Sequence, residues 1–473
     1  MIEEKHASLD IGKLTSSVVE ELRSLHTYSD RCSIYRVPKR LRKLKEGAYT
    51  PQAVSIGPLH QGKEELAEME GHKIIYLQEF LKMTGVSTED LIAAIAEKET
   101  RLRDCYAETF GKLASEEFVK MMMMDGSFIL MVLWKYVYNI QNSNIERVVN
   151  DRWVDTEIRY DLCLLKNQLP FFILEDLFEF SSFNVPCSMI ELIHAFLVDV
   201  CTAWVPDRRD VNLEEIINLN SSRVPEHFID FVRLCQQPIN QKQPSYYENM
   251  AIPSAVELQQ AGVKFKSRSS KNIFDINFDG NTGTLEIPIL KIYRSSEMVF
   301  RNLHAFVQCH CRVEYVSDYI TMINLLVYAT RDVEMLVRHG VVENWLRDND
   351  EALRLLHDLD RNNIVNRASF YYSDVVEGLR DYMKKPTNKW KAALALNYFN
   401  NPWVSISVIA AVFLFILTIT QTVFSILQVV RMQHLVSCEL TELYCLISCN
   451  KLCLCRALWL KLLESLILAF NES

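Results

Sequence analysis

The segment AVSIGPLHQGKEEL contains residue types and a spacing that suit phosphate chemistry. Gly57, Gly62 and Lys63 stand where the P-loop pattern G-x-x-x-x-G-K-[ST] has its two glycines and its lysine. The next position should supply a hydroxyl group to Mg²⁺, but Glu64 occupies it, and Pro58 removes a backbone N–H group that the phosphate cradle would use. The segment therefore argues against nucleotide binding and predicts a turn that leads into a helix.

Two features of the following residues predict that helix. Carboxylates in a first helical turn interact favourably with the helix dipole, and the candidates are Glu64, Glu65 and Glu68. Apolar residues then recur at steps of three and four positions, which predicts one stripe that faces the core. The members of this stripe are Ile74, Leu77, Phe80 and Leu81.

Histidine and cysteine residues raise the possibility of metal or acid–base chemistry. His60 and His72 lie near Glu70, and a second group contains His304, Cys309, His310 and Cys311. Neither group has a zinc-site spacing, and Cys309 and Cys311 on one helix would point about 200° apart. Nucleophile-elbow, kinase and zincin motifs are absent from the sequence. We therefore predict structural histidines, no metal and no cofactor.

Two clusters of basic residues are candidates for contact with anionic lipid, which attracts each nearby cation by ~1 kcal/mol. The run KRLRKLK is the first cluster, and the second stands directly before a long apolar segment. The candidate residues are Lys39, Arg40, Arg42 and Lys43 in the first cluster, and Lys384, Lys385, Lys389 and Lys391 in the second.

The apolar segment runs from Trp403 to Val430 without a charged residue. As a helix at about 1.5 Å per residue it would reach ~42 Å, which exceeds the ~30 Å hydrocarbon core of a bilayer. Four lysines precede the segment, whereas Arg431 is the only cation close behind it. The positive-inside rule then places most of the chain in the cytoplasm. We expect a single-pass membrane protein, at the plasma membrane.

Composition favours helices in the rest of the chain. Hydrophobic residues make up 49% of the sequence, and the 13 glycines and 13 prolines are few for a protein rich in tight βα turns. A formal charge of −9 disfavours nucleic acid as a partner. We predict a leader over 1–30, a helical domain over 31–395 with a linker or surface loop near 236–250, a membrane helix over 403–430, and a tail over 431–473.

Two segments of the helical domain predict local structure more closely. In DINFDGNTGTLEIP, Ile276 and Phe278 and then Leu285 and Ile287 alternate around a Gly/Asn/Asp turn, which predicts a small β-hairpin. The segment RYDLCLLKNQLPFFILEDLFEF predicts two apolar helices separated at Pro170.

The tail over 431–473 is rich in cysteine and ends in an apolar helix pattern that contains Lys461 and Glu464. Internal charges disfavour a second span and favour an amphipathic helix at the membrane surface. The tail is either a genuine extension or an artefact of the gene model. Its five cysteines would be palmitoylation sites in the cytoplasm or disulfide partners in a lumen. They are Cys438, Cys445, Cys449, Cys453 and Cys455.

Several stretches between residues 31 and 430 together resemble one plant family, that of the domain of unknown function 247. They include IYRVPKRLR, YTPQAVSIGPLHQG, MEGHK, DGSFIL, LLKNQLPFFILEDLF, DINFDGNTGTLEIP and NKWKAALALNYFNNPW. The resemblance implies a plant protein with a mostly helical domain and one C-terminal membrane helix, and it implies no particular chemistry. Its motif residues with an expected structural role are Gly57, Pro58, His60, Gly62, Asn167 and Pro170.

The fold expected is therefore mainly α: a large helical domain with one small β-hairpin, followed by a single C-terminal transmembrane helix. Some grass members of the family are linked to self-recognition in pollination, which implies binding of a ligand or partner. We expect a non-enzymatic, membrane-anchored module for protein interaction, signalling or recognition. The alternative is a membrane-bound enzyme that uses dispersed residues, in which His60 or His72 would meet carboxylates or a cysteine in a pocket.

Overall fold

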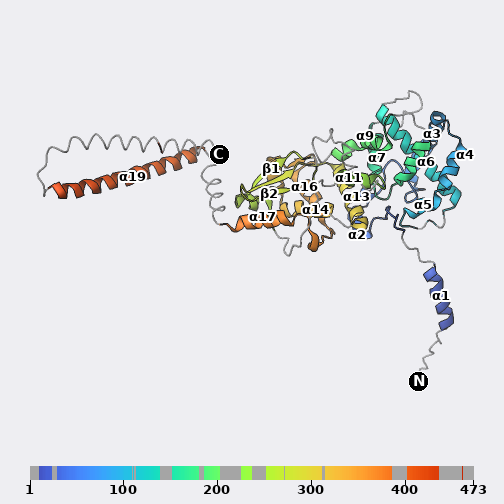
Figure 1. Ribbon diagram of the computed structural model, residues 1–473, viewed down its shortest axis with the longest axis horizontal. Helices are drawn as coiled ribbons and strands as arrows, with labels where there is room; N and C mark the ends of the chain where they lie inside the picture. The colour runs from blue at the N-terminus through green and yellow to red at the C-terminus, as the bar shows by residue number, and fades with distance from the viewer. Residues whose placement is uncertain are drawn as a thin grey trace, which may run out of the picture. The chain divides into compact units, whose positions relative to one another are not determined.

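The protein is mainly helical, as the sequence predicts, with few strands (Figure 1). It divides into two compact units, Met1–Ala393 and Leu394–Ser473. The computed structural model describes residues 10–23, 29–108, 110, 113–138, 152–180, 186–202, 225–236, 252–270, 272–311, 315–385, 402–435 and 461.

The first unit contains helices throughout its described length. The helices of its first half are α1 Ile11–Arg23, α2 Lys39–Arg42, α3 Ala67–Thr84, α4 Thr88–Ala96, α5 Glu99–Asp104, α6 Ser115–Tyr138, α7 Arg152–Asp161, α8 Phe171–Phe180, α9 Met189–Thr202 and α11 Phe228–Gln236. Those of its second half are α12 Ala255–Gln260, α13 Arg294–His310, α14 Tyr315–Leu326, α15 Thr330–Arg338, α16 Asn349–Asp360 and α17 Ser373–Lys384. Short 3₁₀ turns are η1 Glu46–Tyr49, η2 Glu64–Leu66 and η4 Arg367–Ser369.

Local capping explains several of these boundaries. Helix α3 ends at Gly85, which has a left-handed φ of 71° and donates its N–H to the Leu81 carbonyl. The Ser87 hydroxyl then accepts the Asp90 N–H at the start of α4. Ser254 opens α12 with a reciprocal capping box, because its own N–H binds the Glu257 carboxylate at 3.0 Å.

Helix α6 forms the centre of the first half. Nearly all of its side chains from Phe118 to Leu133 are buried, and it packs against α3, α4, α8 and α9. A Cβ atom on Gly126 would lie 2.5 Å from Leu177 Cδ1 of α8, so this glycine permits the close approach of the two helices. Helices α11 and α13 lie between the first-half helices and the strand-containing end of the unit (Figure 1).

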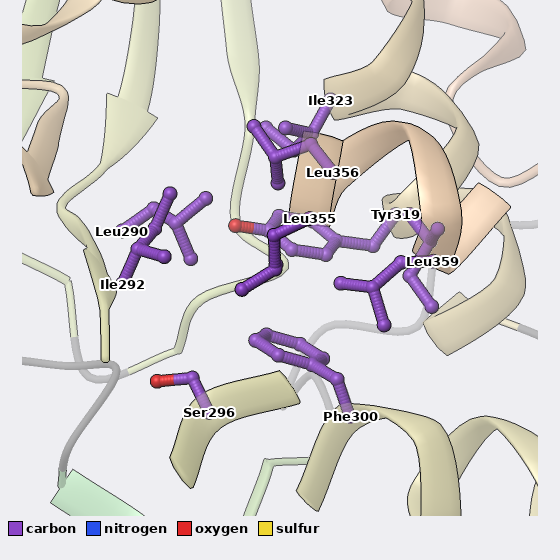
Figure 2. A pocket seen from close by; sticks show the side chains of 10 residues that line it. Leu290, Ile292, Ser296, Phe300, Tyr319, Ile323, Leu355, Leu356 and Leu359 are labelled. Carbon is purple, nitrogen blue, oxygen red and sulfur yellow. The ribbon is translucent and has the colours of Figure 1, made fainter. Parts of the chain in front are cut away.

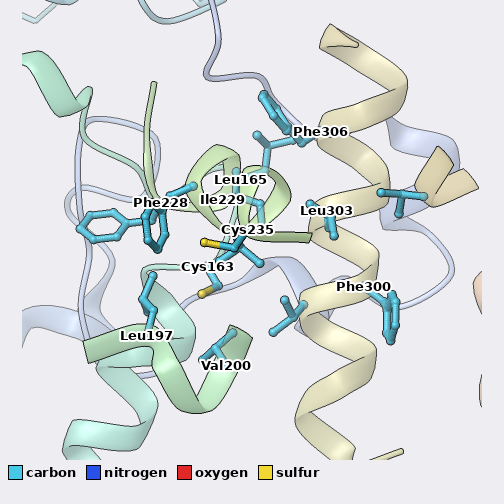
Figure 3. Close-up of a cluster of buried hydrophobic side chains, with 14 of the residues drawn as sticks. Cys163, Leu165, Leu197, Val200, Phe228, Ile229, Cys235, Phe300, Leu303 and Phe306 are labelled. Atoms are coloured by element: carbon cyan, nitrogen blue, oxygen red, sulfur yellow. The ribbon is translucent and has the colours of Figure 1, made fainter. Parts of the chain in front are cut away.

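The buried cluster around α11 joins these parts (Figure 3). Side chains from α9, α11 and α13 converge there with two side chains of the irregular segment that follows α7. The labelled members are Leu197 and Val200 of α9, Phe228, Ile229 and Cys235 of α11, Phe300, Leu303 and Phe306 of α13, and Cys163 and Leu165 of the irregular segment. Burial of each large apolar side chain of this kind stabilises the folded state by about 1.5–3 kcal/mol.

The predicted β-hairpin is confirmed, within a larger pattern of strands. Strands β2 Asn277–Asp279 and β3 Thr284–Pro288 pair antiparallel, and Gly283 occupies a left-handed turn position with a φ of 69°. Strand β1 Lys264–Arg268 adds to β3 in parallel, and β4 Leu290–Ile292 pairs in parallel with β5 Val342–Asn344. These parallel pairings were not predicted, because strands of three to five residues carry little periodicity.

Three details of the predicted helices are wrong. The first helix of the pair around Pro170 ends at Asp161, and residues 162–170 are irregular and buried. Glu64 and Glu65 belong to the 3₁₀ turn η2, since α3 begins at Ala67. Ile74 of the predicted stripe is 60% exposed, because the buried face of α3 includes a lysine instead.

The second unit contains α19 Pro402–Leu435. Residues Ile406–Val429 of this helix have a mean hydropathy of 2.3 and are long and apolar enough to cross a membrane. Large apolar side chains are exposed all along this stretch, which distinguishes it from the core helices of the first unit. Lys389, Lys391, nearly all of the predicted linker and the cysteines of the tail lie outside the described residues.

Candidate functional site

The family-like loop that precedes α3 has no regular structure, and buried side chains satisfy its backbone. The carboxylate of Asp161 accepts the N–H groups of Gln52, Ala53 and Val54 at 2.7–3.1 Å. Burial raises the pKa of Asp161 to about 7, and these N–H groups act in the opposite direction. The end of α7 therefore holds residues 52–54 in place.

Asn167 performs the same task from the irregular segment, and Gln168 satisfies backbone groups within that segment. The Asn167 side chain accepts the Ile56 N–H at 2.7 Å and donates to the Val54 carbonyl at 3.0 Å. The Gln168 amide donates to the carbonyls of Leu162 and Leu164 at 2.6 and 2.7 Å. These contacts explain why residues 162–170 are irregular although their composition is that of an apolar helix.

Gly57 lies where this loop meets both α6 and the irregular segment. Its φ is 70°, and a Cβ atom would come within 2.7 Å of the Gln168 carbonyl oxygen. Its N–H donates to Asp125 Oδ2 of α6 at 2.7 Å. A glycine is therefore required here by conformation and by space, and no phosphate is needed to explain it.

Asp125 also forms a buried ion pair with Lys73 of α3. The Lys73 Nζ atom lies 2.6 Å from Asp125 Oδ1, 2.6 Å from Glu70 Oε1 and 2.5 Å from the Ser55 carbonyl oxygen. Burial lowers the pKa of Lys73, but the carboxylates of Asp125 and Glu70 outweigh it and leave the pKa raised. This lysine is therefore a fixed cation.

A cleft of about 600 Å³ opens beside this pair. Gly57, Gln61 and Gly62 form part of its wall, together with the Lys73 and Asp125 pair. Apolar and charged side chains of α3 and α6 and the loop before α6 complete the wall; they include Ile74, Leu113, Met121, Met124, Glu117 and Lys120. A cleft of this volume is large enough for a small molecule or for side chains of a bound peptide.

The Lys73 and Asp125 side chains in the cleft wall already bind one another. Both oxygen atoms of Asp125 are occupied, by Lys73 and by the Gly57 N–H, and Lys73 has three acceptors. A base or nucleophile must have a free lone pair at the reaction pH. This arrangement can orient a ligand and complement its charge, and the bonds that Asp125 accepts stabilise its charged form and make it a weaker base.

The two histidines proposed for acid–base chemistry do not line the cleft. His60 is 2% exposed, and neither of its ring nitrogens has a hydrogen-bond partner among the described residues. His72 is half-buried on α3. Among the other motif residues, Pro58 is half-buried, Pro170 is buried, and Gly62 has a left-handed φ of 79°.

The predicted lipid-contact residues differ in their surroundings. In the first cluster Lys39 and Lys43 are exposed and Arg42 is half-buried, whereas the Arg40 guanidinium donates to the Gln308 side chain at 2.8 Å. In the second cluster Lys384 and Lys385 are exposed at the end of α17. The structure thus leaves most of the described members accessible.

A row of three side chains elsewhere has the order of a catalytic relay. The Tyr35 hydroxyl lies 3.0 Å from His310 Nδ1, and His310 Nε2 lies 3.4 Å from Glu226 Oε2. The hydroxyl, however, donates to the Cys32 carbonyl at 2.6 Å, and burial raises the Tyr35 pKa, so the phenol stays protonated. Within the described ranges, no group of His, Cys, Asp or Glu residues could hold a metal ion. Cys311, predicted to share a helix with Cys309, lies just beyond the end of α13.

A second cavity lies among α13, α14, α16 and β4 (Figure 2). Its volume is about 20 Å³, and its wall is apolar except for the oxygen atoms of Ser296 and Tyr319. The Tyr319 hydroxyl is buried and has no hydrogen-bond partner among the described residues. A cavity of this size holds about one water molecule, so it is a packing defect and not a ligand site.

The sequence contained signals for the ion pair that periodicity alone did not reveal. Asp125 interrupts the apolar run MMMMDGSFIL, and a charge within such a run must have a partner if the helix is buried. Lys73 stands in the family-like stretch MEGHK, on the face of α3 that the neighbouring apolar residues bury. Their pairing depends on how α3 packs against α6, which one segment alone cannot show.

Comparison with known proteins supports the resemblance seen in the motifs. The family model DUF247, described as a plant protein of unknown function, matches residues 34–417. UPF0481 protein At3g47200 of Arabidopsis thaliana is 28% identical over 416 residues, which cover 84% of this chain and 87% of the relative. Putative UPF0481 protein At3g02645 of the same plant is 24% identical over 482 residues, covering 82% and 89%. No solved structure matches. The chain therefore belongs to the DUF247 family of plant proteins, whose function is unknown.

Proposed function

We propose that this chain is a membrane-anchored recognition protein whose cleft beside Gly57 and Gly62 binds a segment of a partner protein. The observation that carries the proposal is the cleft of about 600 Å³, with the Lys73–Asp125 pair fixed in its wall. Loops that bind ligands are typically positioned by a rigid scaffold. Here Asp161, Asn167 and Asp125 hold the loop by its backbone.

The cleft wall favours an amphipathic segment as its occupant. Ile74 is 60% exposed at the cleft, and Met121 and Met124 supply flexible, polarizable side chains that adapt to varied apolar partners. Glu117 and Lys120 add charges of both signs. We expect a partner segment with apolar side chains flanked by charged ones.

Helix α19 supplies the anchor in this proposal. Its apolar stretch Ile406–Val429 is long enough to span a bilayer, and its apolar side chains are exposed. With the lysines that precede it, including Lys384 and Lys385, the positive-inside rule favours a cytoplasmic first unit, and the plasma membrane is the location we expect. These lysines would contact anionic lipid. Full-length protein recovered in the soluble fraction without detergent would contradict the anchor.

The partners that Lys73 and Asp125 already have favour a role in binding over a role in catalysis. Lys73 has three acceptors, each oxygen of Asp125 already accepts one bond, and the histidines are outside the cleft wall. The enzyme alternative would need His60 or His72 to meet carboxylates or a cysteine in a cavity. Its test is turnover of any substrate that depends on His60 or His72.

A plug in the cleft tests the proposal. Gly71 lines the cleft, and a Cβ atom there would meet no atom within 4 Å, so Gly71→Leu places a side chain at the cleft from a Cβ position that has room. Gly47, exposed in η1 with equal space around its Cβ, provides the control Gly47→Leu. Full-length protein in plant membranes would carry the photo-crosslinking residue p-benzoylphenylalanine in place of Ile74.

We expect a discrete crosslinked partner with the unmodified cleft and with Gly47→Leu. The yield should fall at least tenfold with Gly71→Leu, because the plug occupies the volume that the partner needs. A crosslinked product whose yield Gly71→Leu leaves unchanged would contradict binding in this cleft.

A further inference from the structure

A second group of charged residues gathers where three distant segments of the first unit meet. Ile34 forms a parallel β-bridge with Tyr106, and the Tyr106 hydroxyl donates to the Gln168 carbonyl at 3.0 Å. Gly57 packs against that same carbonyl. The residues that follow Ile34, the loop after Gly57 and the end of the irregular segment are thereby brought together.

Lys166 of the irregular segment is the most buried cation of this group. Its residue is 7% exposed, and among the described residues its ammonium group has no hydrogen bond or ion pair. His60, on which the charge of Lys166 acts, is 2% exposed, and both of its ring nitrogens lack a hydrogen-bond partner in the described part of the chain. A buried imidazole with no partner at either ring nitrogen is rare in native proteins.

The charges that surround these two side chains are mostly positive. Burial, together with the positive charges of Arg42, Arg36 and Lys63, lowers the pKa of Lys166 to about 8. Burial likewise lowers the pKa of His60 to about 3, with Lys166 and Lys63 adding to the effect. The imidazole is therefore neutral at physiological pH and carries one N–H donor.

One carboxylate opposes the four cations. Glu108 acts on Lys166 with the opposite sign, but it is bound through both oxygens by the guanidinium of Arg36. Within the described residues, the side chains of Arg42, Lys63 and Lys166 form no ion pair. A half-buried excess of positive charge costs free energy unless an anion neutralises it.

We propose that Arg36, Arg42, Lys63, Lys166 and His60 form a binding site for a phosphate group. Guanidinium and ammonium groups are the usual partners of phosphate oxygens, and a neutral imidazole N–H adds a further donor. The phosphate belongs to a lipid headgroup or to a soluble phosphate compound.

This site is separate from the cleft, although one loop contributes to both. Gln61 and Gly62 line the cleft, whereas His60 and Lys63 do not. The phosphate site does not depend on a protein partner, so it goes beyond the proposed function. Either of the two proposals can fail without the other.

Calorimetric titration of the full-length protein in neutral phosphatidylcholine nanodiscs tests the site. Inositol 1,4,5-trisphosphate and inorganic phosphate are the soluble probes, and sulfate at equal ionic strength is the comparison anion. We expect Lys166→Met to weaken binding of inositol trisphosphate at least tenfold. The matched substitution Lys43→Met, at an exposed lysine of the same basic run, should weaken it less than twofold.

Thermal unfolding separates loss of the site from loss of the fold. The trisphosphate should raise the Tm of the wild-type protein and of Lys43→Met, and it should leave the Tm of a folded Lys166→Met protein unchanged. Equal weakening by both substitutions would show diffuse surface attraction and overturn the proposal. Wild-type affinity in Lys166→Met would overturn it as well.

The lipid composition of the nanodisc identifies the source of the phosphate. If the lipid headgroup occupies the site, phosphatidylinositol 4,5-bisphosphate in the disc will weaken binding of the soluble probe more than phosphatidylserine of equal charge. If a soluble compound is the ligand, the two discs will give equal affinities. Both results support the site when binding depends on Lys166.

Discussion

Two lysines of the first unit, Lys73 and Lys166, are both buried and have opposite surroundings. Lys73 is 2% exposed and has three oxygen acceptors, whereas Lys166 is 7% exposed and has no acceptor among the described residues. The pKa of Lys73 is raised, and that of Lys166 is lowered to about 8. Burial alone therefore does not define the role of a charged residue; the partners that the fold provides define it.

The secondary structure around each lysine accounts for this difference. Lys73 and Asp125 stand on two long helices, α3 and α6, whose packing keeps the carboxylate in place. Lys166 stands in an irregular segment, where the neighbouring Asn167 and Gln168 side chains bond to backbone groups. The first lysine completes the fold, and the second remains available to an external anion.

The largest effect is expected from Lys73→Met. It leaves the buried Asp125 carboxylate without its cation, which should lower the free energy of unfolding by about 3–5 kcal/mol. Urea unfolding of the full-length protein in detergent, followed by circular dichroism, measures this change. Glu70→Gln is the control, because the Glu70 side chain is 47% exposed and its loss should cost less than ~1 kcal/mol. If Glu70→Gln lowers the free energy of unfolding as much as Lys73→Met does, the buried pair of Lys73 and Asp125 has no special role in stability.

Acid should destabilise the protein through His60, the buried neighbour of Lys166. Its folded pKa of about 3 is below the ordinary 6.5, so between these values the unfolded chain binds a proton that the folded chain does not. The stabilisation is complete above pH 6.5 and falls as the pH decreases toward 3, by up to ~1.4 kcal/mol per pH unit. His60→Leu should reduce the slope of stability against pH between 6.5 and 5. An identical slope in the two proteins would mean that His60 is solvated.

Gly57→Ala should destabilise the loop, because Gly57 contacts both Asp125, the partner of Lys73, and Gln168 in the segment that carries Lys166. The φ of 70° and the approach of 2.7 Å to the Gln168 carbonyl make any side chain strained, which should cost about 1–3 kcal/mol. Gly62→Ala, where a Cβ atom meets nothing within 4 Å, separates the cost of the positive φ from that of the contact. If the two substitutions lower the Tm equally in thermal unfolding, the contact with the Gln168 carbonyl does not contribute to the loss of stability.

Lys166→Met should have the smallest effect in the absence of a ligand. It removes a buried charge without an acceptor and keeps most of the stem, so the free energy of unfolding should change by no more than ~1 kcal/mol or rise slightly. Chemical unfolding of Lys166→Met and Lys73→Met in phosphate-free buffer compares how the same substitution changes the free energy of unfolding at the two lysines. A loss of 3–5 kcal/mol at Lys166 would mean that this lysine is structural too.

Local sequence patterns predicted the elements that depend on neighbouring residues. The hairpin around Gly283, the helical class of the fold and the apolar helix that contains Ile406–Val429 all follow from short-range periodicity and turn chemistry. The same reasoning failed at residues 162–170 and at Ile74. There, side chains distant in the sequence satisfy polar groups, and an apolar pattern cannot reveal such partners.

The sequence by itself determined that this is a helical plant protein with an apolar helix of membrane-spanning length, because these properties depend on composition, periodicity and the order of its motifs. It also showed that Glu64 and Pro58 disfavour a nucleotide cradle. Only the tertiary structure decided that Lys73 has a carboxylate partner and that Lys166 and His60 have none among the described residues. The physical reason is that electrostatic compensation depends on distances between helices and loops that are far apart along the chain.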